Sequence, residues 1–511
     1  MTRAWPRAAW LAAVLLFALA LRLYHVRDPI LDHPGWRQGD QAAIARNFAR
    51  LENNVFRPQV DYDGPPPNYV ELELQIAPFL AAQLDRAFGV HVIFGRLVVL
   101  VFGLGAIALM YFLGAELFGP RAGLLAALLF AVAPGAVYYG RTFMPDMVML
   151  CFTIGTLLFW WRWQARRKPA DFVLAIAFGV LAWLAKPPAL VALAPIIAVP
   201  FAKRGARGFA DWSLYAFALL TLAPLVAYLS YVHGIAEWHW ASGITAKHVL
   251  PALRAALRTP HAFIAALAGA LALLRMLADI LGPVLFALGL VGGFALPRGD
   301  GSRERAWLVW SWLAALAAYT FVVVTVERVD YYLLPWLPIA ALVAGGALAS
   351  FAERFLPGRL RPALVAGLAG AAFVMVYANM LIIHPYYTWS RPVYAAALEL
   401  DRKLAPGTLI VMGHYDPSVL YLINRKGWEE DAALWNVHDM SSAIAKGARY
   451  FVAVEVPRFK ANRPLYAFMQ RYRRVPVASG WQVYDMRHFA PRAGVRPKVD
   501  ANRERQRGHM Q

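Results

Sequence analysis

The stretch HVIFGRLVVLVFGLGAIALMYFLGA occupies residues 91–115, and its side chains are almost continuously apolar. An α-helix rises about 1.5 Å per residue, so roughly 20 such residues cross the hydrocarbon core of a bilayer, which is about 30 Å thick. A single segment satisfies its own backbone there only as a helix. The stretch therefore predicts a transmembrane helix.

Comparable runs recur along the chain. Of its 511 residues, 60% are hydrophobic and 16% are charged, which is more apolar surface than a soluble core absorbs. With the first run, which begins at Ala8, the sequence predicts about eleven transmembrane helices, the others lying near 91–115, 121–138, 144–162, 171–185, 188–202, 212–232, 277–296, 306–326, 333–352 and 361–383. The predicted fold class is an α-helical polytopic membrane protein.

Two apolar segments need separate interpretation. Ala18 and Ala20 form a pattern typical of signal-peptide cleavage, but the run continues through Tyr24, which favours a retained first helix. The run from Ile264 to Leu274 is too short to span, so we expect an interfacial or re-entrant helix. The single cysteine, Cys151, lies in an apolar run and cannot by itself build a disulfide or a zinc site.

Basic residues in alternate short loops predict the orientation, because such loops stay in the cytoplasm. Four loops carry these clusters: Arg162, Arg166, Arg167 and Lys168; Lys203, Arg204 and Arg207; Arg298, Arg303 and Arg305; Arg354, Arg359 and Arg361. The N-terminus is then cytoplasmic, and the other side is the periplasm of a bacterium, with the chain in the inner membrane. The net charge of +20 is dispersed over the loops, which favours anionic lipid headgroups over nucleic acid as partners.

Three longer segments share the outward side: 25–90, 233–276 and everything after 384. We divide the chain into a transmembrane module (1–383), a small periplasmic α/β domain (384–490) and a basic disordered tail (491–511). Within the α/β domain the pattern predicts strands at 407–412, 450–456 and 481–484, and helices at 416–424 and 465–474.

The first outward segment contains a polar helix start. Trp36, Arg37 and Asp40 follow a Pro-Gly turn, and Ile44 and Phe48 continue at helical spacing. We predict an amphipathic helix on the membrane surface, and a second one at 72–88.

Other polar groups fall on the same outward side: Arg141 and Asp146, the lone cation Lys186 before two prolines, and the aromatic pair Tyr331 and Tyr332. Carboxylates suit deprotonation of an acceptor hydroxyl, and cations suit a departing phosphate. Simpler readings stay open. Asp40 and Asp146 could complement helix dipoles, the arginines could reach headgroups, and the tyrosines could form an interfacial belt. The scattered histidines His33, His233, His239 and His248 show no ligand spacing.

In these motifs the chain resembles the bacterial branch of the ArnT-like and protein O-mannosyltransferase-like group (glycosyltransferase family 39) of GT-C glycosyltransferases. The resemblance is carried by Gly35-Trp-Arg-Gln-Gly-Asp40, Arg141-Thr-Phe-Met-Pro-Asp146, Lys186-Pro and Asp330-Tyr-Tyr-Leu-Leu-Pro335. It covers most of the membrane portion.

The resemblance implies an inverting glycosyltransferase that uses a polyprenyl-phosphate sugar, such as an undecaprenyl-phosphate monosaccharide. By position, Asp40 would be the general base, and Asp146 would position donor or acceptor. Arg37, Arg141 and Lys186 would bind the donor phosphate, while Trp36, Tyr331 and Tyr332 would line the cavity.

The acceptor is left open among a lipid such as lipid A, a polysaccharide and a protein. Gln41 follows Asp40 where many eukaryotic relatives have a second acid, and the MIR domain of those relatives is absent, so a protein acceptor is not favoured. No cofactor is expected. Two carboxylates could hold a divalent metal, but three candidate cations already meet the phosphate. The alternative functions are a lipid-linked sugar transporter or flippase and a glycan polymerase or ligase.

Overall fold

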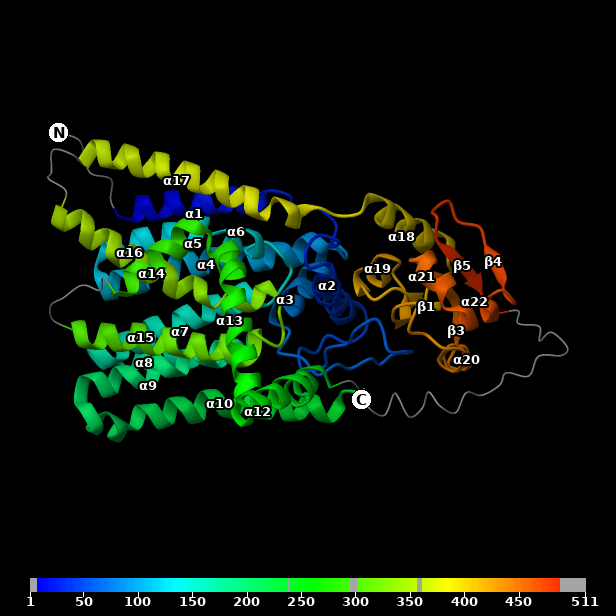
Figure 1. The fold of residues 1–511 in the computed structure, drawn as a ribbon, viewed down its shortest axis with the longest axis horizontal. Coiled ribbons are helices and arrows are strands. Elements are labelled where there is room, and N and C mark those ends of the chain that lie inside the picture. The colour runs from blue at the N-terminus through cyan, green and yellow to red at the C-terminus, as the bar shows by residue number, and fades with distance from the viewer. Residues whose placement is uncertain (1–6, 238, 295–300, 356–360, 488–511) are drawn as a thin grey trace. The chain divides into compact units, whose positions relative to one another are not determined.

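The structure is a computed structural model that describes residues 7–237, 239–294, 301–355 and 361–487. The chain forms two compact units (Figure 1). The first comprises Met1–Asp61 and Pro67–Arg391, and the second comprises Tyr62–Pro66 and Pro392–Gln511. The predicted tail at 491–511 lies outside the described residues.

The first unit is a bundle of long helices. Six helical segments in its described part are long and apolar enough to cross a membrane: Val92–Phe118, Pro187–Ala210, Trp212–Ile235, Pro260–Leu281, Ser302–Val324 and Trp336–Arg354. The corresponding helices are α4 (Val92–Phe118), α9 (Leu193–Arg204), α10 (Trp212–Ile235), α13 (Pro260–Leu281), α15 (Ser302–Tyr319) and α16 (Trp336–Phe355). The chain is thus a multi-pass membrane protein.

Further apolar helices complete the bundle: α1 (Arg7–Leu23), α5 (Pro120–Val132), α7 (Asp146–Arg166), α8 (Pro169–Ala185), α14 (Pro283–Phe294) and α17 (Arg361–Ile383). The run expected at 121–138 is broken into α5 and α6 (Pro134–Tyr139). Pro134 has no N–H to continue the ladder, and Ala133 before it is extended.

The expectation for residues 264–274 is wrong. The segment Ile264–Leu274, interpreted as a short interfacial or re-entrant helix, lies inside α13, which is 22 residues long. The helix expected at 277–296 is instead divided between α13 and α14 at Gly282, whose φ of +79° favours glycine. Arg275 and Asp279 interrupt the apolar pattern inside α13, so the sequence divided this one helix between two shorter runs.

The first outward segment forms α2 (Gly35–Arg50) and α3 (Ile76–Phe88). Helix α3 is close to the predicted range of 72–88, and α2 contains the residues that were predicted to be helical, but α2 is not a half-exposed surface helix. Every residue from Gln38 to Phe48 is buried, including the polar ones. Its polar side chains therefore face protein in place of solvent. Between α10 and α13 the second outward segment forms α11 (Trp240–Ile244), a π-helical turn (Thr245–Val249) and α12 (Leu250–Arg258).

The second unit contains a five-stranded mixed sheet in the order β2-β1-β3-β5-β4. Strand β1 (Leu409–Gly413) pairs in parallel with β2 (Lys426–Glu429) and β3 (Ala448–Ala453), and β5 (Gln482–Asp485) runs antiparallel to β3 and β4 (Arg473–Val475). Its helices are α18 (Arg391–Lys403), α19 (Pro417–Leu422), α20 (Val437–Ala445), α21 (Val456–Ala461) and α22 (Arg463–Met469). The apolar core includes Val411, Met440, Phe451 and Phe459.

Candidate active site

The first turn of α2 carries an arginine that faces two carboxylates. Arg37 donates to Glu73 Oε1 at 2.5 Å, and its Nη1 lies 3.8 Å from Asp40 Oδ2, one turn along the helix. All three side chains are largely buried. Burial lowers the pKa of the Arg37 guanidinium, but Glu73 and Asp40 outweigh burial and raise that pKa above its ordinary value. Arg37 is therefore a fixed positive charge.

A second charge pair joins two consecutive helices. Lys186 Nζ donates to Asp146 Oδ1 at 2.7 Å, and both side chains are almost fully buried. Asp146 begins α7 after Pro145, and Lys186 is an extended residue between the end of α8 and a 3-10 helix at Pro187–Ala192. The prolines at 187 and 188 stop α8 and leave the lysine at its C-terminus, where the helix dipole favours a cation.

The two pairs lie within electrostatic range of each other, since Asp146 interacts with Arg37 and Glu73 as well as with Lys186. The second carboxylate oxygen of Asp146 is buried and has no hydrogen-bond partner among the described residues. A buried acceptor without a donor favours a hydroxyl-bearing ligand at this position.

Aromatic rings cover the lysine. Lys186 Nζ lies 4.7 Å from the ring centroid of Tyr331 and 5.1 Å from that of Tyr332. These tyrosines come from a 3-10 helix, Asp330–Leu333, that precedes α16. Trp36 lies 6.4 Å from Tyr331, ring centroid to ring centroid. Seven of the eight residues singled out from the sequence are thus connected: Trp36, Arg37, Asp40, Asp146, Lys186, Tyr331 and Tyr332. We call these seven and Glu73 the charged cluster.

Arg141 has other partners. Its Nη2 lies 2.7 Å from Asp32 Oδ2, and its guanidinium packs 4.9 Å from the Tyr138 ring centroid and 4.5 Å from that of Tyr387. Arg96, from α4, binds the other oxygen of Asp32 at 2.8 Å. Asp32, Arg96 and Arg141 are completely buried, so the structure places Arg141 in a separate node of one carboxylate and two arginines.

Sequence reasoning missed Glu73, Asp32 and Arg96. A charged residue inside an otherwise apolar run is a signal for a buried functional or structural site, and Arg96 carried that signal within residues 91–115. Glu73 and Asp32 lie in polar segments, where nothing in the sequence distinguishes them from solvated acids.

A further missed cluster contains Asp330. His33 Nε2 lies 3.3 Å from both oxygens of Asp330, and Tyr139 donates to Oδ2 at 2.8 Å. Burial raises the pKa of Asp330, but the hydrogen bonds from His33, Tyr386 and Tyr139 outweigh it and hold that pKa below its ordinary value. The cluster ties the start of the first outward segment to the turn that carries Tyr331 and Tyr332.

Two of the histidines that show no ligand spacing in the sequence meet in space. His233 Nδ1 lies 3.0 Å from Glu71 Oε1, His239 Nδ1 lies 3.9 Å from Glu71 Oε2, and the two imidazole rings stack at 4.0 Å between centroids. Their possible ligand atoms lie within 4.8 Å of one another. Ser242 also donates to Glu71, at 2.8 Å. Glu71 therefore holds the second outward segment against the first.

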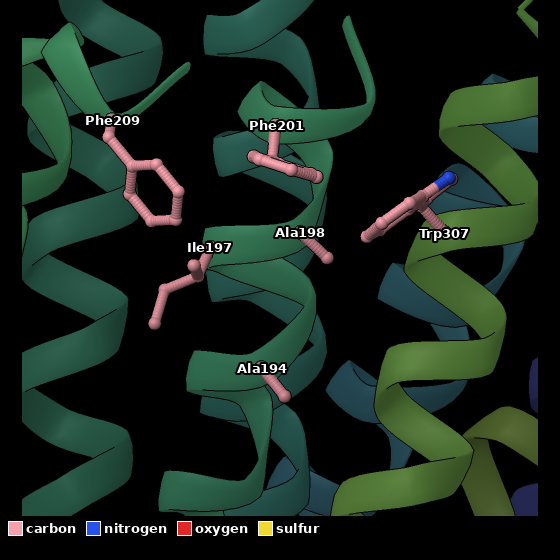
Figure 2. Close-up of a pocket in the computed structure, with 6 residues that line it drawn as sticks. All are labelled: Ala194, Ile197, Ala198, Phe201, Phe209 and Trp307. Carbon is pink, nitrogen blue, oxygen red and sulfur yellow. The ribbon is translucent and has the colours of Figure 1, made fainter. Parts of the chain in front are cut away.

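An apolar pocket of about 330 Å³ lies among α9, the 3-10 helix Gly205–Ala210 and α15 (Figure 2). Its lining residues are Ala194, Ile197, Ala198, Phe201, Phe209 and Trp307, and Figure 2 shows Phe209 and Trp307 on either side of the helix that carries the other four. None of these side chains carries a charge. The pocket offers no group for acid, base or phosphate chemistry, and it shares no residue with the charged cluster.

Comparison with known proteins is consistent with the sequence motifs. Residues 76–231 match a family model described as dolichyl-phosphate-mannose-protein mannosyltransferase. No curated protein sequence matches the chain.

Solved structures match over nearly the whole chain. ArnT from Cupriavidus metallidurans, bound to undecaprenyl phosphate, is 15% identical with a TM-score of 0.62 and covers 93% of this chain and 98% of its own. AglB from Archaeoglobus fulgidus, an oligosaccharyltransferase with an inhibitory peptide and a dolichol-phosphate, is 14% identical (TM-score 0.59, 96% and 75% covered). The arabinofuranosyltransferase AftD from Mycobacteria is 14% identical (TM-score 0.53, 93% and 40% covered).

These matches show the fold that the chain shares with the three proteins. The chain is a multi-pass membrane protein with the GT-C glycosyltransferase fold, and the resemblance of its sequence to the ArnT-like and protein O-mannosyltransferase-like group is confirmed.

Proposed function

We propose that the chain is an inverting glycosyltransferase that moves a monosaccharide from a polyprenyl-phosphate donor, such as undecaprenyl phosphate, to an acceptor in the bacterial periplasm. The acceptor is lipid A, a polysaccharide or a protein. The chain would lie in the inner membrane with the charged cluster and the C-terminal unit on the periplasmic side.

The observation that carries this proposal is the pairing of two buried cations with carboxylates inside the charged cluster. Arg37 and Lys186 are each held by an acid, at 2.5 Å and 2.7 Å. A donor phosphate would compete with these acids for the cations and take up their hydrogen bonds. The cluster therefore contains both the positive charge for a leaving phosphate and the bases for an incoming hydroxyl.

The reaction would be a single displacement. The acceptor oxygen forms a bond to the anomeric carbon while the bond from that carbon to the phosphate oxygen breaks, and the electron pair leaves with the phosphate. Asp40 takes the proton of the acceptor hydroxyl as general base. Arg37 and Lys186 stabilise the charge that develops on the phosphate, so a general acid is not required.

The other residues take supporting roles. The unpartnered oxygen of Asp146 accepts a hydrogen bond from a sugar or acceptor hydroxyl, and Trp36, Tyr331 and Tyr332 form the wall around it. Arg141 is left out of phosphate binding because its guanidinium lies on Asp32 and two tyrosine rings, in a node that shares no residue with the charged cluster. We propose that transfer needs no divalent metal, since two side-chain cations meet the phosphate.

What the structural neighbours bind supports this donor class. ArnT was solved with undecaprenyl phosphate, and AglB with dolichol-phosphate and a peptide. Both lipids present a phosphate on a long polyprenyl chain, which is the chemistry that the two cations of the charged cluster would meet.

The proposal is tested by mass spectrometry of polyprenyl-phosphate sugars in a strain that lacks the gene. We expect one donor to accumulate, the native gene to clear it, and Asp40→Asn to leave it in place. Asp85→Asn is the matched control, because Asp85 is a buried carboxylate on α3 that accepts from the backbone N–H of His91, outside the charged cluster. It should clear the donor. Clearance by Asp40→Asn, or no accumulation at all, would favour the transporter alternative.

A further inference from the structure

A buried node of hydrogen bonds lies between the first outward segment and the loop before α7. The side chains of Asp32, Gln38 and Arg96 and the backbone N–H of Phe143 make up this node, which we call the Gln38 node. The three side chains are completely buried.

Gln38 uses its whole hydrogen-bonding capacity there. Its Nε2 donates to the Asp32 carboxylate at 2.7 Å and to the Asp32 carbonyl at 3.1 Å. Its Oε1 accepts from Arg96 Nη2 and from the backbone N–H of Phe143, both at 3.3 Å. A side-chain amide offers two donors and two acceptor sites, so each is occupied and the amide orientation is fixed.

The bonds of Gln38 reach both segments that carry candidate catalytic acids. Gln38 lies two residues before Asp40 on α2, and Phe143 lies three residues before Asp146. The bond from Phe143 N–H to Gln38 Oε1 is therefore a short link between the two segments. Both acids lie on helices, since Asp40 is in the second turn of α2 and Asp146 is the first residue of α7. The hydrogen bond therefore fixes the position of one helix relative to the other.

Arg96 fixes this link to the bundle. It also donates to the backbone carbonyls of Val26 at 3.2 Å and Asp28 at 2.7 Å, within the chain that leads from α1 to α2. Helix α4, which carries Arg96, packs against α7 as well. A shift of the Gln38 amide would thus move α2 relative to α7 and change the distance between the two acids.

We propose that Gln38, held by Asp32 and Arg96, is a positioning residue that sets the spacing of Asp40 and Asp146 for glycosyl transfer. This inference rests on the proposed function. Gln38 touches neither donor nor acceptor in this role. A misplacement of a reacting group by about 1 Å costs on the order of 10²-fold in rate, so loss of the link should lower kcat more than it raises KM.

The test compares variants that change the link with little change in volume. Gln38→Glu keeps an oxygen that accepts from Arg96 and from the N–H of Phe143. Its buried carboxyl should bind a proton, so that its second oxygen donates to the Asp32 carboxylate as the amide nitrogen does. Gln38→Asn keeps the amide but is one methylene too short to reach. We expect Gln38→Glu to retain kcat within about fivefold and Gln38→Asn to lose about 10- to 100-fold, with the donor KM changed less than about threefold.

Asn47→Ala is the control for a merely structural effect. Asn47 is a buried amide on the same helix that donates to the Gln59 carbonyl at 2.8 Å and to Asp61 at 3.1 Å. It should lower thermal stability in detergent about as much as Gln38→Asn and leave kcat within about twofold. A third variant, Gln38→Met, should behave as Gln38→Asn.

The outcomes are distinct. Equal kcat values for Gln38→Glu and Gln38→Asn, or a kcat loss in Asn47→Ala that matches Gln38→Asn, would overturn the positioning role. If the native protein transfers no sugar from any polyprenyl-phosphate donor in proteoliposomes, the proposed function itself fails, and the inference with it.

Discussion

Lys186 could stabilise the fold through its ion pair with Asp146, and it could donate to the leaving phosphate. The variant Lys186→Met tests both roles. Methionine matches the length of the lysine chain but removes the ammonium that donates to Asp146 at 2.7 Å. Both partners are almost fully buried, so the variant leaves an uncompensated carboxylate in the interior. Removing one partner of a buried pair costs about 3–5 kcal/mol, and we expect a stability loss of that order.

The effect on activity has a different origin. If Lys186 donates to the leaving phosphate, its loss removes a preformed charge-assisted donor. Removing one such donor costs about 2.7–4 kcal/mol of transition-state stabilisation, which is about 10²- to 10³-fold in kcat. The tyrosine rings at 4.7 and 5.1 Å remain, but they supply no positive charge.

The double variant Lys186→Met with Asp146→Asn distinguishes these effects. A neutral amide no longer needs a cation, so we expect the double variant to regain most of the lost melting temperature while kcat stays low. The assay is transfer from a defined polyprenyl-phosphate sugar in proteoliposomes, with thermal unfolding in detergent beside it. Turnover of the double variant within about tenfold of the native protein would refute a role of Lys186 at the phosphate.

Three other predictions follow from single contacts. Glu73→Gln should lower the donor KM severalfold, because the 2.5 Å bond that a phosphate must displace from Arg37 is weakened; an unchanged KM in the proteoliposome assay would contradict this competition. The pKa of Asp330 lies below its ordinary value despite burial, so its stabilising effect is present above about pH 3.9 and is lost as the pH falls below it. Asp330→Asn should therefore flatten the acid side of the curve of melting temperature against pH, and an unchanged curve would argue against it. Gly427→Ala should unfold the C-terminal sheet, since a Cβ there would lie 1.8 Å from a β1 carbonyl oxygen, and limited proteolysis of that unit should become faster. In the control Gly480→Ala, the added Cβ has no heavy atom within 4 Å among the described residues, so the rate of proteolysis should stay unchanged.

The membrane character of the chain could be predicted from the sequence because it depends on length and polarity alone. Residues 91–115 are nearly all apolar, and α4 covers Val92–Phe118. The positions where helices break were harder to predict from the sequence. Pro134 begins a helix and Gly282 follows the end of one within segments that are mostly apolar, and a hydropathy pattern does not show a change of backbone direction.

The C-terminal sheet was only partly predictable. Strands β1, β3 and β5 carry buried apolar residues and were expected close to their positions, whereas β2 and β4 were missed. The sequence of β2, Lys-Gly-Trp-Glu, shows little strand periodicity, and β4 contains two arginines. Such strands form because a neighbouring strand offers backbone hydrogen bonds, which is a tertiary effect.

The residues of the candidate site could be predicted from the sequence, but their partners could not. Residue type and predicted sidedness singled out Arg37, Asp40, Asp146 and Lys186, since charges in the connections between apolar runs stand out. The partners of these residues were not visible. Glu73 is 36 residues from Arg37, and only the packing of α2 beside α3 brings the preceding segment to that arginine.

By itself the sequence determined that the chain spans a membrane in many helices, and it singled out the charged residues from which a transferase could be built. The tertiary structure decided which charges pair. Lys186 pairs with Asp146, and Arg141 pairs with Asp32. The polar face of α2, which the helical periodicity had predicted to lie at the surface, is buried. The physical reason is that hydrophobic length acts locally along the chain, whereas the partner of a buried charge is fixed by segments that meet only after folding.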